Sequence, residues 1–171
     1  MNKPEVLIIM GSISDKNIMK NTWNTLKELG INYEVFVSSA HRTPNQMREI
    51  VENAVSKGVE VIIAGAGASA HLPGVIAAEV IIPVIGVPID SSPLKGIDSL
   101  FSIVQMPPGI PVSTVGVGSM GAKNAAFLAA SILGLKNEKI KKTLIEKRKK
   151  MAEKVISDNK TLQDELTNED S

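Results

Sequence analysis

A histidine and an arginine stand side by side in the stretch SSAHRTP, where His41 and Arg42 fall between an expected strand and an expected helix. The chain has only two histidines, and Ser39 and Ala40 place no bulky neighbour beside this one. An imidazole with an ordinary pKa of about 6.5 is a ready proton carrier, and a guanidinium can grip an anion with paired hydrogen bonds. A structural histidine and a surface salt bridge are the alternatives. We favour a proton carrier at His41, whereas an anion contact and a surface salt bridge remain equally open for Arg42.

The segment GSISD, residues 11–15, is a small, hydroxyl-rich turn that leads into an expected helix. Free backbone amides and the positive end of a helix dipole suit a phosphate there. The alternative is that Ser12 and Ser14 only cap the helix. Asp15 is an anion, so it suits sugar hydroxyls rather than phosphate. No P-loop lysine pattern is present, so ATP is not the obvious ligand.

The segment GAGASAHLPG, residues 65–74, consists almost entirely of small residues before His71. Such residues let the backbone approach a flat ligand closely, and tight packing alone could also select them. His71 either faces this ligand or caps the next helix. Two histidines without a carboxylate cluster do not predict a metal site. There is also no GxSxG elbow that would make a serine a nucleophile.

Apolar, β-branched runs alternate with helical patterns along the chain, and these elements must position the polar segments. We expect strands at 5–10, 32–39, 59–64, 84–88 and 112–117, and helices at 15–29, 44–57, 73–80, 94–104, 121–133 and 138–156. Thr43, Pro44 and Gln46 form a capping-box pattern with proline at the first helical position. Alanines in the helix 121–133 allow close packing, either on the chain's own sheet or on another subunit: Ala122, Ala125, Ala126, Ala129 and Ala130.

This alternation predicts a single α/β domain, a three-layer α/β/α sandwich of the flavodoxin-like kind with a five-stranded parallel sheet and an additional C-terminal helix. We assign residues 1–157 to the domain and 158–171 to an acidic, frayed tail. Ligands bind beyond the carboxyl ends of such strands. Four unusual segments fall there, at 11–15, 38–44, 65–74 and 86–96. Together they predict one site.

Composition narrows the class of protein further. The 171 residues include no cysteine, which excludes disulfides and thiolate chemistry. Residues 136–154 carry nine basic and three acidic side chains, but with only 3% aromatic residues we interpret them as a solvated helix face rather than a nucleic-acid site. The apolar run 6–10 is too short for a signal peptide, and prolines break the run 72–89, so we expect a cytoplasmic protein without a membrane partner.

Several motifs in the same order closely resemble the PurE family, the N5-carboxyaminoimidazole ribonucleotide mutases of de novo purine biosynthesis. They are GSISD at Gly11, SAHRTP at Ser39, AGAGASAHLPG at Ala64, GVP at Gly86, DSLFSIVQMPPGIPV at Asp98 and AKNAAFLAA at Ala122. The resemblance covers about residues 6–135. It implies a flavodoxin-like subunit, a homo-octamer with active sites at subunit contacts, and an isomerase that moves a carboxylate from N5 to C4 of its substrate to give 4-carboxyaminoimidazole ribonucleotide. It implies neither a metal nor an organic cofactor.

The resemblance also implies roles for individual residues. His41 would be the catalytic proton shuttle, Arg42 with two serines would hold the phosphate, and Asp15 would hold the ribose. The remaining substrate-binding positions would surround the ligand: Ser12, Ser14, Ser39, Ala40, Gly65, Ala66, Gly67, Ala68, His71 and Leu72.

Two features qualify the resemblance. The third segment reads GAGASAH where the family commonly has GAGGAAH, so Ala68 and Ser69 add bulk and a hydroxyl beside the expected pocket. The related class that carboxylates aminoimidazole ribonucleotide directly with CO2 shares several motifs and is the second candidate. A non-enzymatic flavodoxin-like module is a remote third, because receiver carboxylates are missing after the first and third strands, and Trp23 and Tyr33 lie away from the polar segments.

Overall fold

The five strands form one parallel sheet. The computed structural model describes residues 3–169, and its strands are β1 (Val6–Met10), β2 (Tyr33–Val37), β3 (Val61–Gly67), β4 (Val84–Ile89) and β5 (Ser113–Thr114). Their order across the sheet is β2-β1-β3-β4-β5, and every neighbouring pair is parallel. This is the flavodoxin-like order, so the predicted fold class is confirmed.

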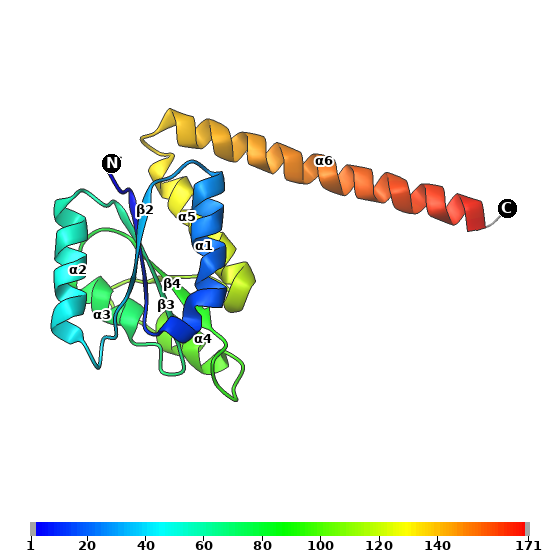
Figure 1. Ribbon diagram of the computed structural model, residues 1–171. Helices are drawn as coiled ribbons and strands as arrows, with labels where there is room; N and C mark the ends of the chain where they lie inside the picture. Colours follow the sequence, from blue (N-terminus) through cyan, green and yellow to red (C-terminus); the bar gives the residue numbers. More distant parts are fainter. Residues whose placement is uncertain (1–2, 170–171) are drawn as a thin grey trace.

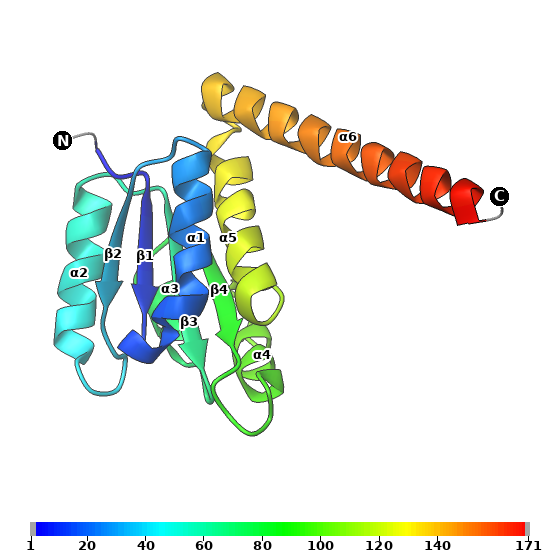
Figure 2. The same ribbon diagram turned by 45° about the vertical axis from the view of Figure 1, so that its right-hand side comes forward.

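Helices cover both faces of the sheet (Figures 1 and 2). They are α1 (Lys16–Glu28), α2 (Pro44–Ser56), α3 (Leu72–Glu79), α4 (Ile97–Val104), α5 (Gly118–Leu133) and α6 (Glu138–Glu169), with a 3-10 turn at Ile13–Asp15 before α1. Successive β1 side chains alternate between two buried clusters: Val6 and Ile8 pack with α1 and α5, while Leu7 and Ile9 pack with α2 and α3. The alternation follows from the two-residue repeat of a strand.

The alanine stripe of α5 packs within its own subunit. All five of these alanines have no exposed surface, and the Thr22 hydroxyl of α1 donates a hydrogen bond of 2.9 Å to the Ala122 carbonyl. Small side chains here let α1 and α5 lie side by side on the sheet (Figure 2). Of the two roles considered for the stripe, the structure supports packing inside the chain.

The strands β3 and β5 differ in length from expectation. β3 was expected to end at Ala64 but continues through Gly67, because β4 pairs with Ala64, Gly65, Ala66 and Gly67. β5 was expected at 112–117 but has only two residues, since its ladder to β4 ends at the pairing of Gly86 with Thr114. Neighbouring strands thus decide strand length more than local propensity does.

Helix α6 is much longer than the predicted 138–156. It continues to Glu169, so residues 158–169, which we expected to be frayed, are helical, and Asp170 and Ser171 lie outside the described residues. Its N-terminal part contacts the body, where Ile140 is buried, Leu144 packs against the core and Lys147 pairs with Glu28 of α1. The rest of the helix extends away from the sandwich (Figures 1 and 2). Within residues 3–169 no helix is long and apolar enough to cross a membrane.

Candidate active site

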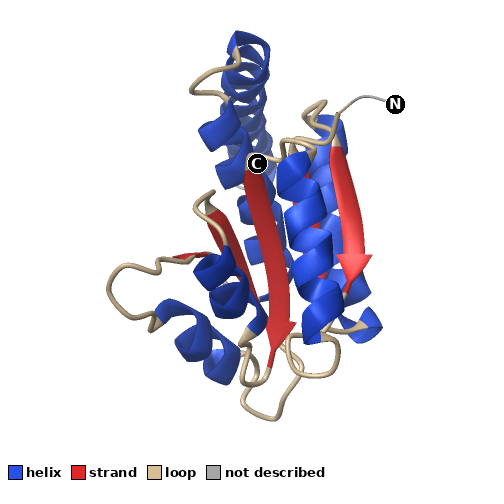
Figure 3. Ribbon diagram, turned by 90° about the vertical axis from the view of Figure 1, so that its left-hand side faces the viewer, coloured by secondary structure: helices blue, strands red, loops and turns tan. Residues whose placement is uncertain are grey.

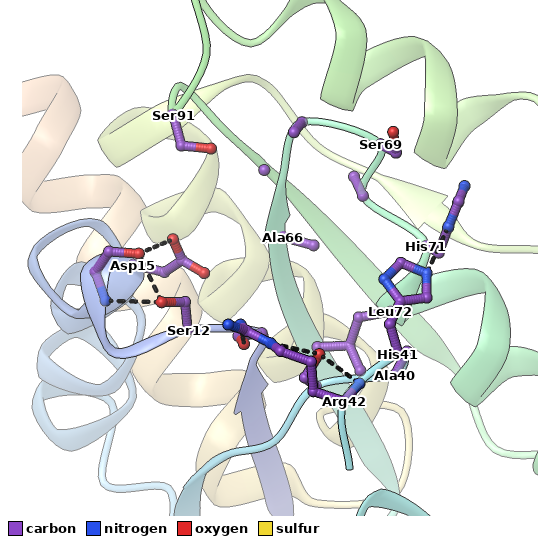
Figure 4. Close-up of a pocket in the computed structure, with 16 residues that line it drawn as sticks. Ser12, Asp15, Ala40, His41, Arg42, Ala66, Ser69, His71, Leu72 and Ser91 are labelled. Carbon is purple, nitrogen blue, oxygen red and sulfur yellow. Dashed lines mark hydrogen bonds between the residues drawn. The ribbon is translucent and has the colours of Figure 1, made fainter. Parts of the chain in front are cut away.

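The carboxyl ends of β1, β2, β3 and β4 meet at one edge of the sheet, and the loops that follow them surround a pocket of about 360 Å³. Figure 3 shows these loops gathered at the lower end of the sheet, and Figure 4 shows the pocket itself. Its lining residues are Gly11, Ser12, Ser14, Asp15, Ser39, Ala40, His41, Arg42, Ala66, Gly67, Ala68, Ser69, Ala70, His71, Leu72 and Ser91. Every predicted site residue except Gly65 is among them.

The loop after β1 is held by its own hydroxyl groups. Ser12 caps the turn that follows it, accepting hydrogen bonds from the Ser14 amide at 3.3 Å and the Ser14 hydroxyl at 2.8 Å. The Ser14 hydroxyl also lies 3.2 Å from Oδ1 of Asp15. Asp15 is only 5% exposed, and this burial raises the pKa of its carboxyl, with the serine hydrogen bonds opposing the shift. The loop therefore presents fixed hydroxyls beside a partly desolvated carboxyl.

Arg42 reaches from the second loop to the first. Its Nη2 donates to the Gly11 carbonyl at 3.4 Å, and its backbone amide donates to the Ser39 hydroxyl at 3.2 Å. None of the ion pairs among residues 3–169 involves Arg42, so its positive charge lies beside the Ser12 turn without a carboxylate partner. Such a guanidinium can bind an anion in the pocket.

Thr43 does not form the predicted capping box. It precedes α2 at the N-cap position, but its side chain makes no capping hydrogen bond. Instead its hydroxyl accepts a hydrogen bond of 2.9 Å from the Ser39 amide and lies 3.0 Å from the Ser38 hydroxyl. The hydroxyl is turned toward the loop, so Thr43 stabilises the segment that carries His41 and Arg42.

The third loop is made of small residues because other groups pack tightly against it. A Cβ on Gly65 would collide with Met19 of α1, and one on Gly67 would collide with the Ser91 side chain. Gly65 was predicted to bind substrate, but it lies inside β3 beneath the pocket, where its carbonyl accepts a hydrogen bond of 3.2 Å from the Gly11 amide. Ala68 and Ala70 have φ angles of 50° and 31°, in the region that favours glycine.

The two histidines contact each other across the pocket. Nε2 of His41 lies 2.8 Å from Nδ1 of His71, and the rings meet edge to face at 88° with centroids 4.9 Å apart. His71 occupies the N-cap position of α3, yet its side chain makes no capping hydrogen bond. The side chain of His71 therefore does not cap α3, which was the alternative role considered for it.

Four lining residues were not among the predicted ones: Gly11, Ser69, Ala70 and Ser91. Ser69 had been noted only as a departure from the family pattern. Ser91 belongs to the segment 86–96, which the strand pattern already placed at this edge of the sheet, so the position of the segment was the available signal. The sequence did not indicate which residue of that segment would line the pocket.

Fold and pocket together define a flavodoxin-like α/β protein with a polar ligand site at the carboxyl ends of its strands. In the pocket, two imidazoles and one guanidinium lie beside a wall of small residues. The sequence profile of the AIR carboxylase family matches residues 5–154. The chain belongs to that family.

Individual relatives agree with this assignment. The N5-carboxyaminoimidazole ribonucleotide mutase of Pyrococcus abyssi is 57% identical over 86% of this chain and 84% of its own length. The protein of the same name from Thermotoga maritima is 54% identical over 90% of this chain and 88% of its own length. The crystal structure of Treponema denticola PurE superposes with a TM-score of 0.85 at 31% identity, covering 93% of this chain and 98% of that one.

Proposed function

We propose that this chain is an isomerase of purine biosynthesis, an N5-carboxyaminoimidazole ribonucleotide mutase that yields 4-carboxyaminoimidazole ribonucleotide. Curated mutases share half or more of their residues with it over most of the chain. The observation that carries the proposal is the pocket, in which a proton carrier, His41, is adjacent to a cation, Arg42, that has no carboxylate partner among residues 3–169.

The reaction needs one proton to move in each direction. When the C–N bond to N5 breaks, the carboxylate leaves as CO2 and the nitrogen takes a proton. When C4 then bonds to CO2, the proton on C4 leaves. One imidazole can donate the first proton and accept the second, so a single acid–base group suffices. We assign that role to His41.

The rest of the pocket supplies binding. Arg42, Ser12 and Ser39 hold the phosphate, because the guanidinium and the two hydroxyls lie together at the turn before α1. Asp15 accepts hydrogen bonds from the ribose hydroxyls. The small residues 66–70 leave room for the flat imidazole and for CO2, and holding both reactants close together raises their effective concentration. No metal or organic cofactor enters this scheme.

Direct carboxylation of aminoimidazole ribonucleotide is the second candidate, since the matching family profile carries the description AIR carboxylase. The two activities separate in one experiment. The purified protein is incubated with N5-carboxyaminoimidazole ribonucleotide and, separately, with aminoimidazole ribonucleotide plus bicarbonate. We expect efficient conversion of the first alone, whereas efficient use of the second alone would select the carboxylase.

We also propose that the chain forms a homo-octamer with active sites at subunit contacts. Apolar side chains left exposed in the single chain support association: Val35 and Phe36 on β2, Ile97 and Phe101 on α4, and Val155 on α6. Light scattering should then give about eight times the mass of the 18.2 kDa chain. Cytoplasmic location stays a prediction, which fractionation of cells producing the protein would test.

A further inference from the structure

The hydrogen bond between His41 and His71 joins the only two histidines of the chain. A bond between two ring nitrogens needs one donor and one acceptor, so one proton lies between Nε2 of His41 and Nδ1 of His71. The rings come from different loops, which follow β2 and β3. The contact therefore exists only because those loops meet at the edge of the sheet.

This bond decides which nitrogen of His41 can serve the substrate. Nε2 is occupied by His71, and Figure 4 shows Nδ1 turned toward the interior of the pocket, away from His71. A proton exchanged with a ligand must therefore leave from or arrive at Nδ1. For a neutral His41 to act as a base, Nδ1 must be the nitrogen without hydrogen, and Nε2 must carry it.

We propose that His71 is a positioning residue that accepts a hydrogen bond from Nε2–H of His41 at its own Nδ1 and so keeps Nδ1 of His41 as the proton-exchanging atom. Before the first step, His41 is protonated at both ring nitrogens and carries the positive charge, and its Nε2–H points to His71. His71 is neutral and carries its own proton on Nε2. His41 gives the Nδ1 proton to the substrate nitrogen, and the pair becomes neutral. It regains that proton from C4, which restores the starting state.

The side chain of His71 has no competing structural task in residues 3–169. It does not cap α3, and its hydrogen bond to His41 is the one polar contact of its ring in this part of the chain. The start of α3 is held instead by the backbone, where the Val75 amide donates to the His71 carbonyl at 3.0 Å. Replacing the imidazole therefore removes the ring contact and leaves the backbone bond that begins α3.

Nitrogen-15 NMR of solid protein with labelled histidine rings tests the bond directly. With only two histidines, four ring nitrogen signals are expected. We expect neutral His41 to be protonated at Nε2, and a scalar coupling between that nitrogen and Nδ1 of His71. A neutral His41 protonated at Nδ1, or the absence of the coupling, would overturn the proposal.

Activity tests the consequence for the mutase reaction. The variant His71→Leu should lower kcat by about tenfold or more, a larger factor than any change it causes in the affinity for 4-carboxyaminoimidazole ribonucleotide. His71→Asn should recover much of kcat, because its Oδ1 can accept the bond from His41. Equal losses in the two variants, or an unchanged kcat in His71→Leu, would contradict the role.

A double variant provides the matched control. If His71 acts through His41, adding His71→Leu to His41→Asn should cause no further loss. Independent, additive losses would count against positioning. The inference rests on the proposed function, yet the two fail differently: a wild type that converts neither substrate refutes the mutase, while the NMR spectrum still decides the state of the histidine pair.

Discussion

The two sides of the pocket are built differently. On the side formed by residues 11–15, 39 and 42, which we call the anchoring side, hydrogen bonds within and between two loops link the polar groups. On the proton side, formed by residues 41 and 66–72, a single bond between two imidazoles lies among alanines and glycines. A fixed network suits a group that binds without changing, and a group that exchanges a proton needs one nitrogen left open. Mutations should therefore separate binding from turnover.

The largest effect is expected on the proton side. His41→Asn removes the exchangeable proton and should lower kcat by about 10²–10⁴-fold, because general acid–base catalysis contributes that much. Binding of 4-carboxyaminoimidazole ribonucleotide, measured by calorimetry, should stay within a few-fold of wild type. Near-normal turnover in this variant would refute the assignment of His41.

Arg42→Gln should show the opposite pattern. Loss of a hydrogen-bonding cation should raise KM by about 10–100-fold, since such bonds are worth about 1.5–3 kcal/mol, while kcat changes little. Arg48→Gln is the matched control, because Arg48 is on α2 and pairs with Glu79 outside the pocket. Steady-state kinetics measure KM and kcat for both variants. Equal effects of Arg42→Gln and Arg48→Gln would contradict a specific binding role for the anchoring side.

Asp15→Asn should weaken binding and stabilise the fold. We expect KM to rise about 3–10-fold through weaker ribose hydrogen bonds. Because burial raises the pKa of Asp15 above its ordinary value of 3.8, the folded state binds the proton more tightly, and the free energy of unfolding falls as the pH rises through the window above 3.8. The variant lacks this fall, so at pH 7 it should have a higher free energy of unfolding and a higher Tm than the wild type.

This gain should disappear at pH 3, where the wild-type carboxyl is protonated in both states. Urea unfolding of both proteins at the two pH values provides the measurement. An equal difference at pH 3 and pH 7 would mean that the ionised carboxyl is not what destabilises the wild type.

The smallest effect concerns Ala68, on the proton side. At its φ of 50°, an alanine is destabilised by roughly 1–2 kcal/mol relative to glycine. Glycine offsets part of this advantage, because its unfolded chain has more conformational freedom to lose on folding. Ala68→Gly should therefore raise the free energy of unfolding by about 0.5–1 kcal/mol. Calorimetry measures this change in stability. Ala66→Gly is the control, because Ala66 lies in β3 without a positive φ, so this variant should only be less stable than the wild type. A loss in both variants would show that the left-handed backbone carries no such cost.

Local patterns determined most of the fold. Continuous apolar, β-branched runs predicted the buried strands, and 3.6-residue repeats predicted the helices. The alternation of strands and helices placed four polar segments at one edge of the sheet. The same patterns placed His41 and Arg42 between β2 and α2, and the wider resemblance identified the family. These features depend on neighbours in sequence, so the sequence by itself was sufficient.

Contacts between distant segments were decided only by the tertiary structure. The pairing of Met10 with both Val37 and Gly65 brings three loops together, which lets His41 meet His71 and leaves Gly65 beneath the pocket. The hydroxyl of Thr43 turned away from its expected cap for the same reason, since the folded loop offered it the Ser39 amide. Such choices depend on strand register and on which partner lies within hydrogen-bond distance, and no local repeat encodes either.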